Sequence, residues 1–590
     1  MKFLRELLAA ILGVIIATGI MIFIFIAIIS ASASALGEDG KPTVKNNSVL
    51  ELKLEKTIKD YAPKSSDPFE QLLELDDERL GLNQILNAIE NAKTDDRIKG
   101  ISINTLFING GIAQIQAIRD KLVDFKESGK FILAYADFYL QKNYYLSSVA
   151  DSIFVNPVGE IDFKGLATEI LYYKDFEDKY GVKMEVIKHG KYKSAVEPFI
   201  TNKMSDANKE QITSFLNSIW KELITDIAKS RDKTPEELNV IADDLLARNP
   251  ELAIENKMID GELFLDEYES KLKVASGIDA DDELNKITIG DYIATGKGRI
   301  KSSASDKIAV VYAQGEIRYG KGDENYIGQE ALIKALRKVR KDDKIKAVVL
   351  RVNSPGGSAL VSDIIWRELA LTKKEKPLVV SMSNYAASGG YYISCGATKI
   401  VAEPTTITGS IGVFGMIPNV HQLAGKMGIN AEQVGTNKQS VGYSAFEPLT
   451  DSFHNTVKES IEDIYKTFVN RVAEGRGLTF AQVDSIAQGR VWTGVEAVQN
   501  GLVDQLGNLE DAVEVAAELA EVSDYRITNY PRYKKDFKDA FKPFAFMKAS
   551  KENFLKEELG SENYTLYKNI KEFSELKGIQ ARMPYILEIK

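Results

Sequence analysis

The pattern of apolar and polar positions divides the chain into two similar halves. Alternation at residues 48–54 predicts a strand that opens the first half, and residues 307–312 predict the equivalent strand of the second half. Between them, the small and basic residues 296–305 are typical of a linker. Strand-like and helical patterns then alternate, which predicts an α/β fold with a mainly parallel sheet in each half.

The remaining elements follow from apolar runs with helical or strand-like spacing. In the second half, the predicted elements are, in order, a helix at Glu330–Val339, a strand at Ala347–Val352, a helix at Ala359–Leu371, a strand at Leu378–Met382 and a helix at Gly389–Cys395. Long helices are predicted at Lys203–Lys229 and Asp451–Glu474, one in each half. Beyond about Tyr530 the chain is rich in Lys and Phe without clear periodicity, and we assign it no role.

The two halves also share a set of sequence motifs. Residues 95–157 align without a gap on residues 342–404, with identical residues at scattered, patterned positions. Farther along, a Ser-Ala-x-Glu-Pro block occurs at 194–198 and again at 444–448. A repeat of this length indicates a duplicated domain.

Each copy keeps a reactive residue that the other copy lacks. The second copy has Ser388 in a turn with two glycines, and the first copy has Gln141 at that column. Directly before the shared Ser-Ala-x-Glu-Pro block, the first copy has Lys193 and the second has Tyr443. A serine kept in one half and a lysine kept in the other predict a single active site assembled from both halves.

The N-terminal residues predict a membrane anchor. Lys2 and Arg5 precede the stretch Leu7–Ile29, which contains no charged residue and is long enough to cross about 30 Å of bilayer. This length favours an uncleaved signal-anchor over a cleavable signal peptide, although the small residues at 31–35 are of the cleavage-site type. The basic residues predict a cytoplasmic N-terminus and an extracytoplasmic, periplasmic body on the inner membrane.

Composition narrows the function classes. The chain is 44% hydrophobic and 27% charged, as in soluble globular domains, and its net charge of −10 argues against nucleic acid as a partner. The single cysteine, Cys395, excludes an internal disulfide and is typical of a small buried apolar residue. The predicted segments are a cytoplasmic stub and anchor at 1–30, a flexible linker at 31–47, a first repeat at 48–295, a linker at 296–306, a second repeat at 307–530 and a tail at 531–590.

Two glycine-rich turns in the second half predict a site for a developing negative charge. One spans residues 353–358 and contains Gly356 and Gly357, and the other places Ser388 directly before Gly389. Glycine permits close approach of the backbone, and amides at a helix start point unpaired donors outward. Ser388 would then attack a carbonyl whose charge is held by the amide of Gly389 and that of Gly357 or Gly356. A purely structural role for such turns is the alternative.

A nucleophilic serine needs a base, and Lys193 is the candidate. Burial lowers the pKa of a lysine by destabilising its ammonium form, so a buried lysine can accept a proton. Lys191 is a competitor two residues away, and a solvated surface position is the alternative for either lysine. The three histidines lie outside the shared motifs: His189, His421 and His454.

Ser410 is the candidate partner that orients the lysine. It follows a predicted strand end in a Thr-Gly-Ser-Ile-Gly motif, and the first half has Phe163 at the equivalent column. Its hydroxyl would hydrogen-bond the amine of Lys193. A turn serine that satisfies the local backbone is an equally good interpretation of the sequence.

These motifs resemble those of the signal peptide peptidase A family in its long, duplicated form. The motifs that carry the resemblance lie at 190–199, 353–357, 386–392 and 408–412, and the resemblance extends to about residue 530. It implies that Ser388 is the nucleophile, Lys193 the general base and Ser410 its positioning partner. It also implies tandem Clp/crotonase-like α/β spirals, a homotetramer, and digestion of signal peptides left in the membrane, without metal or other cofactor.

Two other interpretations remain open at this stage. Paired glycine turns also stabilise thioester enolates in crotonase-like acyl-CoA enzymes, but the export signal argues against a cytoplasmic cofactor. A non-catalytic, membrane-anchored assembly scaffold is the second alternative. The distance between Lys193 and Ser388 separates the scaffold from the enzyme, because a general base must lie within about 3 Å of the proton it takes.

Overall fold

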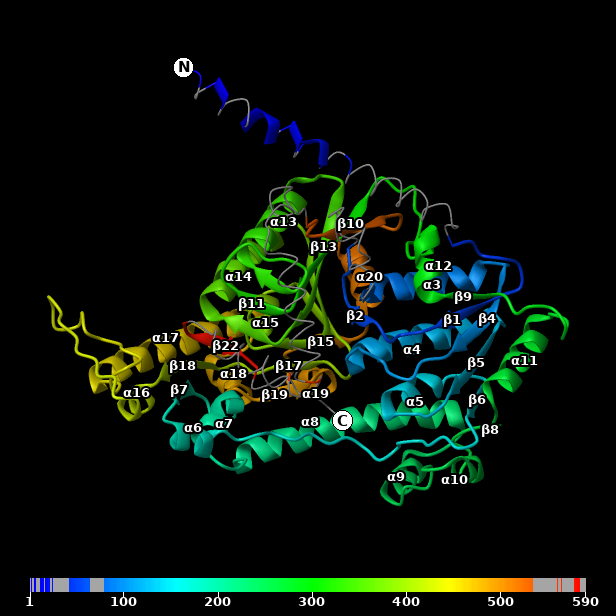
Figure 1. Ribbon diagram of the computed structural model, residues 1–590, viewed down its shortest axis with the longest axis horizontal. Coiled ribbons are helices and arrows are strands. Elements are labelled where there is room, and N and C mark those ends of the chain that lie inside the picture. Colours follow the sequence, from blue (N-terminus) through cyan, green and yellow to red (C-terminus); the bar gives the residue numbers. More distant parts are fainter. Residues whose placement is uncertain are drawn as a thin grey trace.

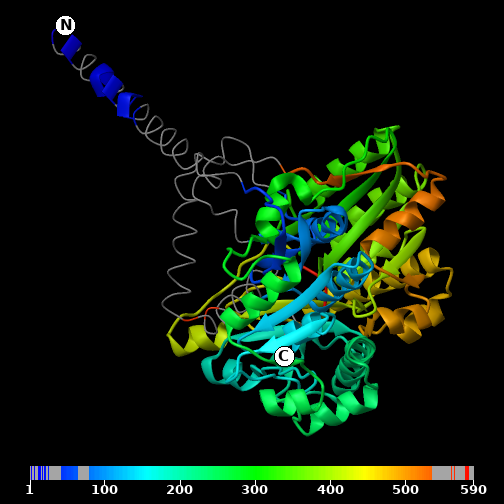
Figure 2. The same cartoon turned by 90° about the vertical axis from the view of Figure 1, so that its right-hand side faces the viewer.

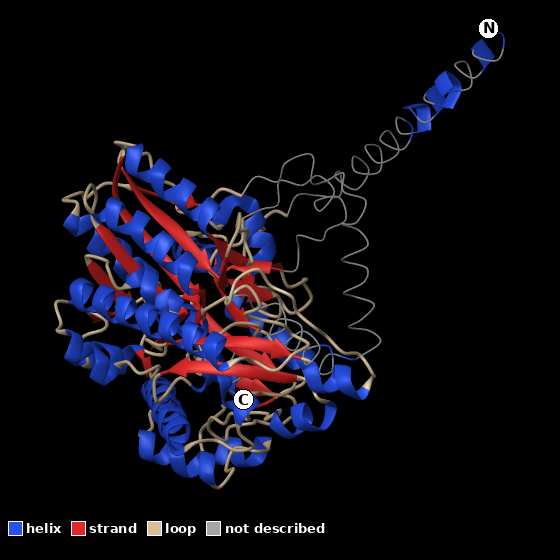
Figure 3. Cartoon of the chain, turned by 90° about the vertical axis from the view of Figure 1, so that its left-hand side faces the viewer, coloured by secondary structure: helices blue, strands red, loops and turns tan. Residues whose placement is uncertain are grey.

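The computed structural model describes residues 42–63, 79–533 and 578–583, with a few further positions near the N-terminus and at Gly560 and Tyr564. The two α/β halves lie side by side, and helix α8 (Asp206–Arg231) runs beneath both (Figure 1). Seen from the side of the first half, its blue and cyan strands lie in front of the green strands of the second half (Figure 2). The strands form inner layers with helices outside them (Figure 3).

The second half is built on the larger sheet, whose strand order is β19-β17-β15-β13-β10-β21. Its central strands β10, β13 and β15 are parallel, whereas β17 and β19 pair antiparallel. Strands β16 and β20 extend it from β15. Its strands are β10 (Lys307–Gln314), β13 (Ile345–Ser354), β15 (Leu378–Ala387), β16 (Lys399–Ala402), β17 (Ile407–Gly409), β19 (Val491–Thr493), β20 (Gln505–Leu506) and β21 (Arg526–Tyr530).

The first half has an all-parallel sheet of strand order β8-β6-β5-β4-β1-β9. Its strands are β1 (Ser48–Leu52), β4 (Ile98–Ile103), β5 (Phe131–Ala136), β6 (Ser152–Val155), β8 (Gly261–Glu262) and β9 (Lys286–Thr288). The repeat seen in the sequence is also a repeat of elements, because equivalent columns begin equivalent elements. Helix α4 (Ile112–Lys126) corresponds to α14 (Ala359–Lys373), and β5 corresponds to β15.

Each sheet is covered by helices on both faces, as its near-continuous apolar strands require. Along β10, Ile308 and Val310 pack with α20 (Leu509–Leu519) on one face. The alternate residues Ala309 and Val311 enter the core on the opposite face, which α13 (Gln329–Lys341), α14, α15 (Gly389–Ser394) and α17 (Asp451–Arg476) help to form. This period of two places successive side chains on opposite faces of the sheet.

The other helices lie around these two sheets. In the first half they are α3 (Leu82–Thr94), α5 (Gln141–Ser147), α6 (Lys174–Tyr180), η1 (Ser194–Val196), α7 (Glu197–Ile200), α9 (Pro235–Asp243), α10 (Pro250–Glu255), α11 (Leu265–Ser276), α12 (Ile289–Tyr292) and η2 (Ile293–Lys297). In the second half they are α16 (His421–Lys426), α18 (Phe480–Ile486) and α19 (Gly494–Gln499). Residues 298–306 contain no helix or strand, and the predicted domain limits there and elsewhere stay predictions.

A third sheet joins the two halves and lies over the candidate site. Its order is β12-β11-β14-β22-β18-β7. Strand β7 (Lys183–His189) comes from the first half. The second half contributes β11 (Glu316–Arg318), β12 (Tyr326–Gly328), β14 (Gly356–Ser358) and β18 (Val413–Asn419). Strands β7 and β18 pair antiparallel from Lys183 opposite Asn419 to His189 opposite Val413. The remaining member, β22 (Gln580–Arg582), comes from the C-terminal tail. Strands β2 (Thr57–Lys59) and β3 (Arg79–Gly81) form a separate pair.

A buried ion pair also crosses between the halves. Arg351 on β13 lies 2.9 Å from a carboxylate oxygen of Asp60, and both side chains are almost fully buried. Asn353 donates a hydrogen bond to the other oxygen of Asp60. A charge in this position needs its partner, because the protein interior solvates an isolated ion poorly. The halves therefore form one structural unit.

The predicted membrane segment Leu7–Ile29 lies largely outside the described residues. Among the positions that the structure does describe, no helix combines the length and the apolar character needed to cross a membrane.

Candidate active site

Ser388 occupies a sharp turn between β15 and α15. Its backbone has φ 55° and ψ −113°, a left-handed φ that a non-glycine residue rarely adopts. The amide of Ser388 donates a hydrogen bond of 2.8 Å to the carbonyl of Gly409, so the end of β17 holds this turn in place. The serine is fully buried. Its hydroxyl is thus positioned by backbone that is itself fixed.

Lys193 reaches the same place from the first half. It follows β7, which is held against β18, and it immediately precedes the short helices η1 and α7. Its side chain is fully buried. Gly489 allows this approach, because a Cβ on Gly489 would lie within 2.7 Å of the Lys193 backbone. The β7–β18 pairing therefore delivers the lysine of one half to the serine of the other.

The lysine amine touches two serines. Its Nζ lies 2.9 Å from Oγ of Ser388, 3.1 Å from Oγ of Ser410 and 3.2 Å from the carbonyl oxygen of Ser410. A neutral amine has two N–H donors and one lone pair. The two contacts to Ser410 use the donors, which leaves the lone pair directed at the hydroxyl of Ser388. Ser410 holds its own position with φ 50° and a 2.6 Å hydrogen bond from its amide to the carbonyl of Arg490.

Burial lowers the pKa of Lys193 well below its usual value of 10.5. The cause is desolvation, which penalises the charged ammonium more than the neutral amine. The ring of Phe414 lies 5.9 Å from Nζ, and the three hydrogen-bonding contacts of Nζ are all to uncharged serine oxygens. The environment therefore favours a neutral lysine, the form that accepts a proton.

The glycines of the two turns lie in contact. Gly356 has φ 99° and Gly357 has φ 153°, both in the region that favours glycine. A Cβ on Gly356 would lie 2.7 Å from the amide nitrogen of Gly389, so the turn at 353–358 packs directly on the start of α15. The sequence predicted a direct strand-turn-helix junction here, and the structure places the short strand β14 between β13 and α14.

The competing residues lie elsewhere. Lys191 is exposed, with its amine 3.5 Å from the hydroxyl of Tyr192. His189 packs on the ring of Tyr465, with 4.0 Å between ring centroids. Within the described residues, the hydrogen bonds of the Ser388 hydroxyl are to Lys193 and to the carbonyl of Gly412. The sequence favoured Lys193 over Lys191 by its position directly before the shared block, and in the structure only Lys193 is buried and contacts Ser388.

The other two histidines and the cysteine carry no chemistry at this site. His421 is exposed and contacts the carbonyl of Phe446, and His454 lies on α17. Cys395 is buried, and burial raises the pKa of its thiol to about 12. A thiol with a raised pKa is a poor nucleophile, which agrees with the prediction of a small buried apolar residue.

Two features of the site gave no signal in the sequence. One is Gly489, whose lack of a side chain makes room for Lys193. The other is β22, which pairs with β14 directly over the glycine turn. A Gly-Arg pair at 489–490 is visible in the sequence but is not distinctive. The tail around residue 580 has no periodicity that predicts a strand.

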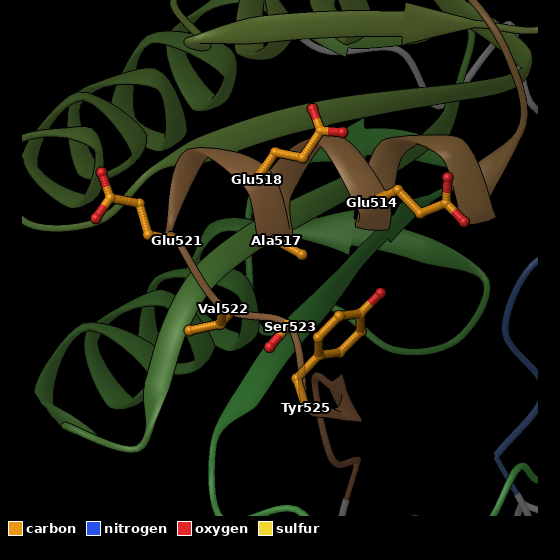
Figure 4. Close-up of a pocket in the computed structure, with 7 residues that line it drawn as sticks. All are labelled: Glu514, Ala517, Glu518, Glu521, Val522, Ser523 and Tyr525. Atoms are coloured by element: carbon orange, nitrogen blue, oxygen red, sulfur yellow. The ribbon is translucent and has the colours of Figure 1, made fainter.

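One surface pocket lies away from these residues. It has a volume of about 410 Å³ and lies beside α20, where three glutamates and Tyr525 surround it (Figure 4). Its lining is Glu514, Ala517, Glu518, Glu521, Val522, Ser523 and Tyr525. Neither Ser388 nor Lys193 lines it. The buried serine and lysine, rather than this pocket, therefore remain the candidate site.

Comparisons with known proteins place this chain in a family. The model of peptidase family S49 matches residues 124–279 and 370–523, one match in each half. The chain is 36% identical to Protease 4 of Haemophilus influenzae, over 84% of this chain and 83% of that protein. It is 37% identical to Protease 4 of Salmonella typhi, over 76% and 74% of the two chains. The chloroplastic serine protease SPPA of Arabidopsis thaliana is 32% identical, over 75% and 66%.

Proposed function

Because the chain belongs to peptidase family S49 and is a serine protease, we propose that Ser388 is its nucleophile and Lys193 its general base. The observation that carries this assignment is the 2.9 Å contact between Nζ of Lys193 and Oγ of Ser388, two fully buried groups from different halves. That distance is within the range for direct proton transfer.

The reaction is acyl transfer from a peptide to Ser388. Neutral Lys193 takes the hydroxyl proton, Oγ attacks the carbonyl carbon, and the resulting ammonium protonates the leaving amine as the C–N bond breaks. Water then gives a proton to the neutral lysine and attacks the acyl ester. The ester bond breaks, Ser388 recovers its proton, and the product carries a new carboxylate.

Two further groups support the transition state. Ser410 accepts both N–H groups of the neutral amine, through its hydroxyl and its carbonyl, and so directs the lone pair of Lys193 at Ser388. The amides of Gly389 and of the 356–357 turn form the oxyanion hole, as their contact across Gly356 suggests. Such preorganised donors contribute about 10²–10³ in rate each.

We infer that the substrates are signal peptides and other apolar peptides in the membrane. The uncharged segment Leu7–Ile29 behind Lys2 and Arg5 supports a single-pass anchor in the inner membrane, with the catalytic halves on the periplasmic side. A membrane-anchored site would meet peptides that remain in the bilayer. Extraction of the membrane fraction with carbonate tests the anchor, because the full chain should stay in the pellet and a chain without residues 1–30 should not.

We also propose that the halves are crotonase-like spirals and that four chains form a closed assembly. A β-β-α unit supports the crotonase-like spiral, since β13 lies in the larger sheet of the second half, β14 lies in the third sheet, and α14 follows them. For the second point, β18 precedes α16 and pairs with β7, which follows α6. Residues 166–172 precede α6 as β18 precedes α16, and residues 429–435 follow α16 as β7 follows α6. Neither segment is helical or paired as a strand within this chain.

Pairing of residues 166–172 with residues 429–435 of a neighbouring copy would repeat the β7–β18 contact between chains. The second segment exposes Ile429 and Val434, with exposed fractions of 49% and 96%. A contact between different surfaces of identical chains is head-to-tail, and it closes into a ring when the rotation permits. Val434→Asp should therefore shift the mass measured by light scattering from a tetramer toward a monomer.

The catalytic assignment is tested by substitution of the two neighbouring lysines. Hydrolysis of a quenched apolar peptide by the purified chain should be abolished by Lys193→Ala and retained by Lys191→Ala, the exposed control two residues away. Activity retained by Lys193→Ala, in a variant that elutes as the parent does, would remove Lys193 as the base.

A further inference from the structure

Strand β22 fills a gap in the third sheet that the two halves leave open. It lies between β14 and β18 and is antiparallel to both. It comes from the far end of the chain, well after β21 has completed the second half. Without it, the edges of β14 and β18 would face one another without a partner. Two such edges form a slot that binds one extended peptide through main-chain hydrogen bonds.

The register of β22 places one carbonyl at the oxyanion turn. The amide of Met583 donates to the carbonyl of Pro355 at 2.6 Å, and the amide of Ala359 donates to the carbonyl of Ile579 at 3.3 Å. Hydrogen-bonded pairs alternate along an antiparallel ladder, so Gly357 and Ala581, which lie opposite each other, form the pair between these two. This register directs the amide of Gly357 toward the carbonyl of Ala581.

The same carbonyl lies against the other two glycines of the site. A Cβ on Gly356 would collide with the oxygen of Ala581, and a Cβ on Gly389 would come within 3.0 Å of it. The carbonyl oxygen of Ala581 thus occupies the space between both glycine turns, directly beside the N-terminus of α15 that Ser388 precedes. This is the place that the proposed mechanism reserves for the carbonyl under attack.

One face of β22 is apolar and has a small residue at this carbonyl. Ala581 is 1% exposed and Met583 2% exposed, and Ile579 packs against the core of the second half. These three alternate along the strand and so share one face. On the other face Arg582 forms an ion pair with Glu316, at 3.5 Å. On the first of these faces the slot accepts apolar residues two positions before and two positions after a central alanine.

We propose that β22 is a substrate of the chain's own active site and that Ser388 cleaves the bond between Ala581 and Arg582. This inference rests on the proposed function. Lys193 takes the proton of the Ser388 hydroxyl, Oγ bonds to the carbonyl carbon of Ala581, and the bond to the nitrogen of Arg582 breaks as Lys193 returns the proton to that nitrogen. Water hydrolyses the ester, which leaves a carboxylate on Ala581 and releases residues 582–590.

The test measures the mass of the full chain purified in detergent. The chain with native Ser388 should lack residues 582–590, and Ser388→Ala should retain them; Lys193→Ala serves as a second inactive variant if Ser388→Ala is poorly folded. Ala581→Phe should retain the tail, because a buried alanine site has no room for a ring. Ala549→Phe, the same change in the tail outside the strand, should be cleaved as the parent is.

Hydrolysis of an unrelated apolar peptide is measured in the same samples. If the parent chain hydrolyses that peptide but keeps residues 582–590, self-cleavage is wrong and the proposed protease function stands. Cleavage at another bond would overturn the register derived from β14. If the parent chain neither hydrolyses the peptide nor loses its tail, the proposed catalytic assignment fails as well.

Discussion

The two halves share an architecture but have different residues at the columns of Ser388 and Ser410. In the second half Ser388 and Ser410 contact the amine of Lys193. In the first half, Gln141 and Phe163 occupy the equivalent columns. The side-chain carbonyl of Gln141 accepts hydrogen bonds from the amides of Lys164 and Gly165, so it fixes a loop. At this column the first half therefore has a side chain with a structural role.

Phe163, at the column of Ser410, also has a structural role. Its side chain is 1% exposed and packs against Tyr144 and Trp220, with ring centroids 5.6 and 5.4 Å away. An aromatic core fills the place where the second half keeps a hydroxyl. Tyr443, at the column of Lys193 in the second half, is exposed and donates to the carbonyl of Pro418. The two halves thus differ at both columns, and the proposed active site takes its serine from one half and its lysine from the other.

The largest expected effect comes from removing Ser388, the proposed nucleophile, which the first half lacks. Ser388→Ala should reduce kcat for peptide hydrolysis by roughly 10⁶-fold, because the residues of a nucleophile-base pair act as a unit. The matched change Gln141→Ala should leave kcat within about twofold, since Gln141 bonds only backbone amides of its own half among the described residues. A large loss in Gln141→Ala would show that the first site still takes part in the reaction.

The paired glycines give the next contrast. Gly357→Ala should lower kcat by about 10²–10³, because it has φ 153° and a Cβ there would collide with the carbonyl of Ile317, displacing an oxyanion donor. Gly110, at the equivalent column, has no such φ, and the nearest atom to its Cβ would be the end of the flexible Ile58 side chain, at 3.1 Å. Gly110→Ala should keep full activity, as measured by steady-state kinetics. Equal losses in both variants would argue for general destabilisation.

Removal of the Ser410 hydroxyl, which is proposed to position Lys193, should have a smaller effect. Ser410→Ala should reduce kcat by about 10–100-fold, as loss of an orienting partner usually does, with little change in the thermal midpoint. Phe163→Ala should do the opposite, lowering the free energy of unfolding by about 3–5 kcal/mol through a cavity in the aromatic cluster. Calorimetry and kinetics on both variants separate the two roles. A Ser410→Ala variant with full activity would contradict the positioning role.

The smallest expected effect is the pH dependence that the buried Lys193 gives to activity and stability. Only neutral Lys193 accepts the serine proton, so kcat/KM should fall about tenfold per pH unit below its folded pKa, which burial holds well below 10.5. Stability changes in the same direction: between that folded pKa and 10.5 the unfolded chain binds the extra proton, so unfolding becomes easier as the pH falls. Lys193→Met should remove this slope in denaturant titrations. An activity profile that rises only near 10.5 would contradict the lowered pKa.

Several elements follow from the local sequence pattern alone, but pairing with distant residues sets where some of them end. Helix α14 begins at Ala359 as its apolar spacing predicts, and α17 begins at Asp451 as predicted. Strand β15 was predicted to end at Met382 but extends to Ala387, because Tyr385 to Ala387 pair with Ile407 to Gly409 of β17. That pairing joins residues from another part of the chain, so no local pattern carries it.

The sequence by itself determined the duplication, the α/β class and the candidates Ser388, Lys193 and Ser410, because repeats, periodicity and retained residue types are properties of the chain order. The sequence favoured Lys193 over Lys191 only by its position before the shared block, and only the tertiary structure showed its burial and its 2.9 Å contact with Ser388, since both depend on β7 crossing to β18. It alone also placed Ala581 at the glycine turns. Both outcomes come from pairing between distant segments, whose free energy lies in main-chain hydrogen bonds and desolvation rather than in local residue preference.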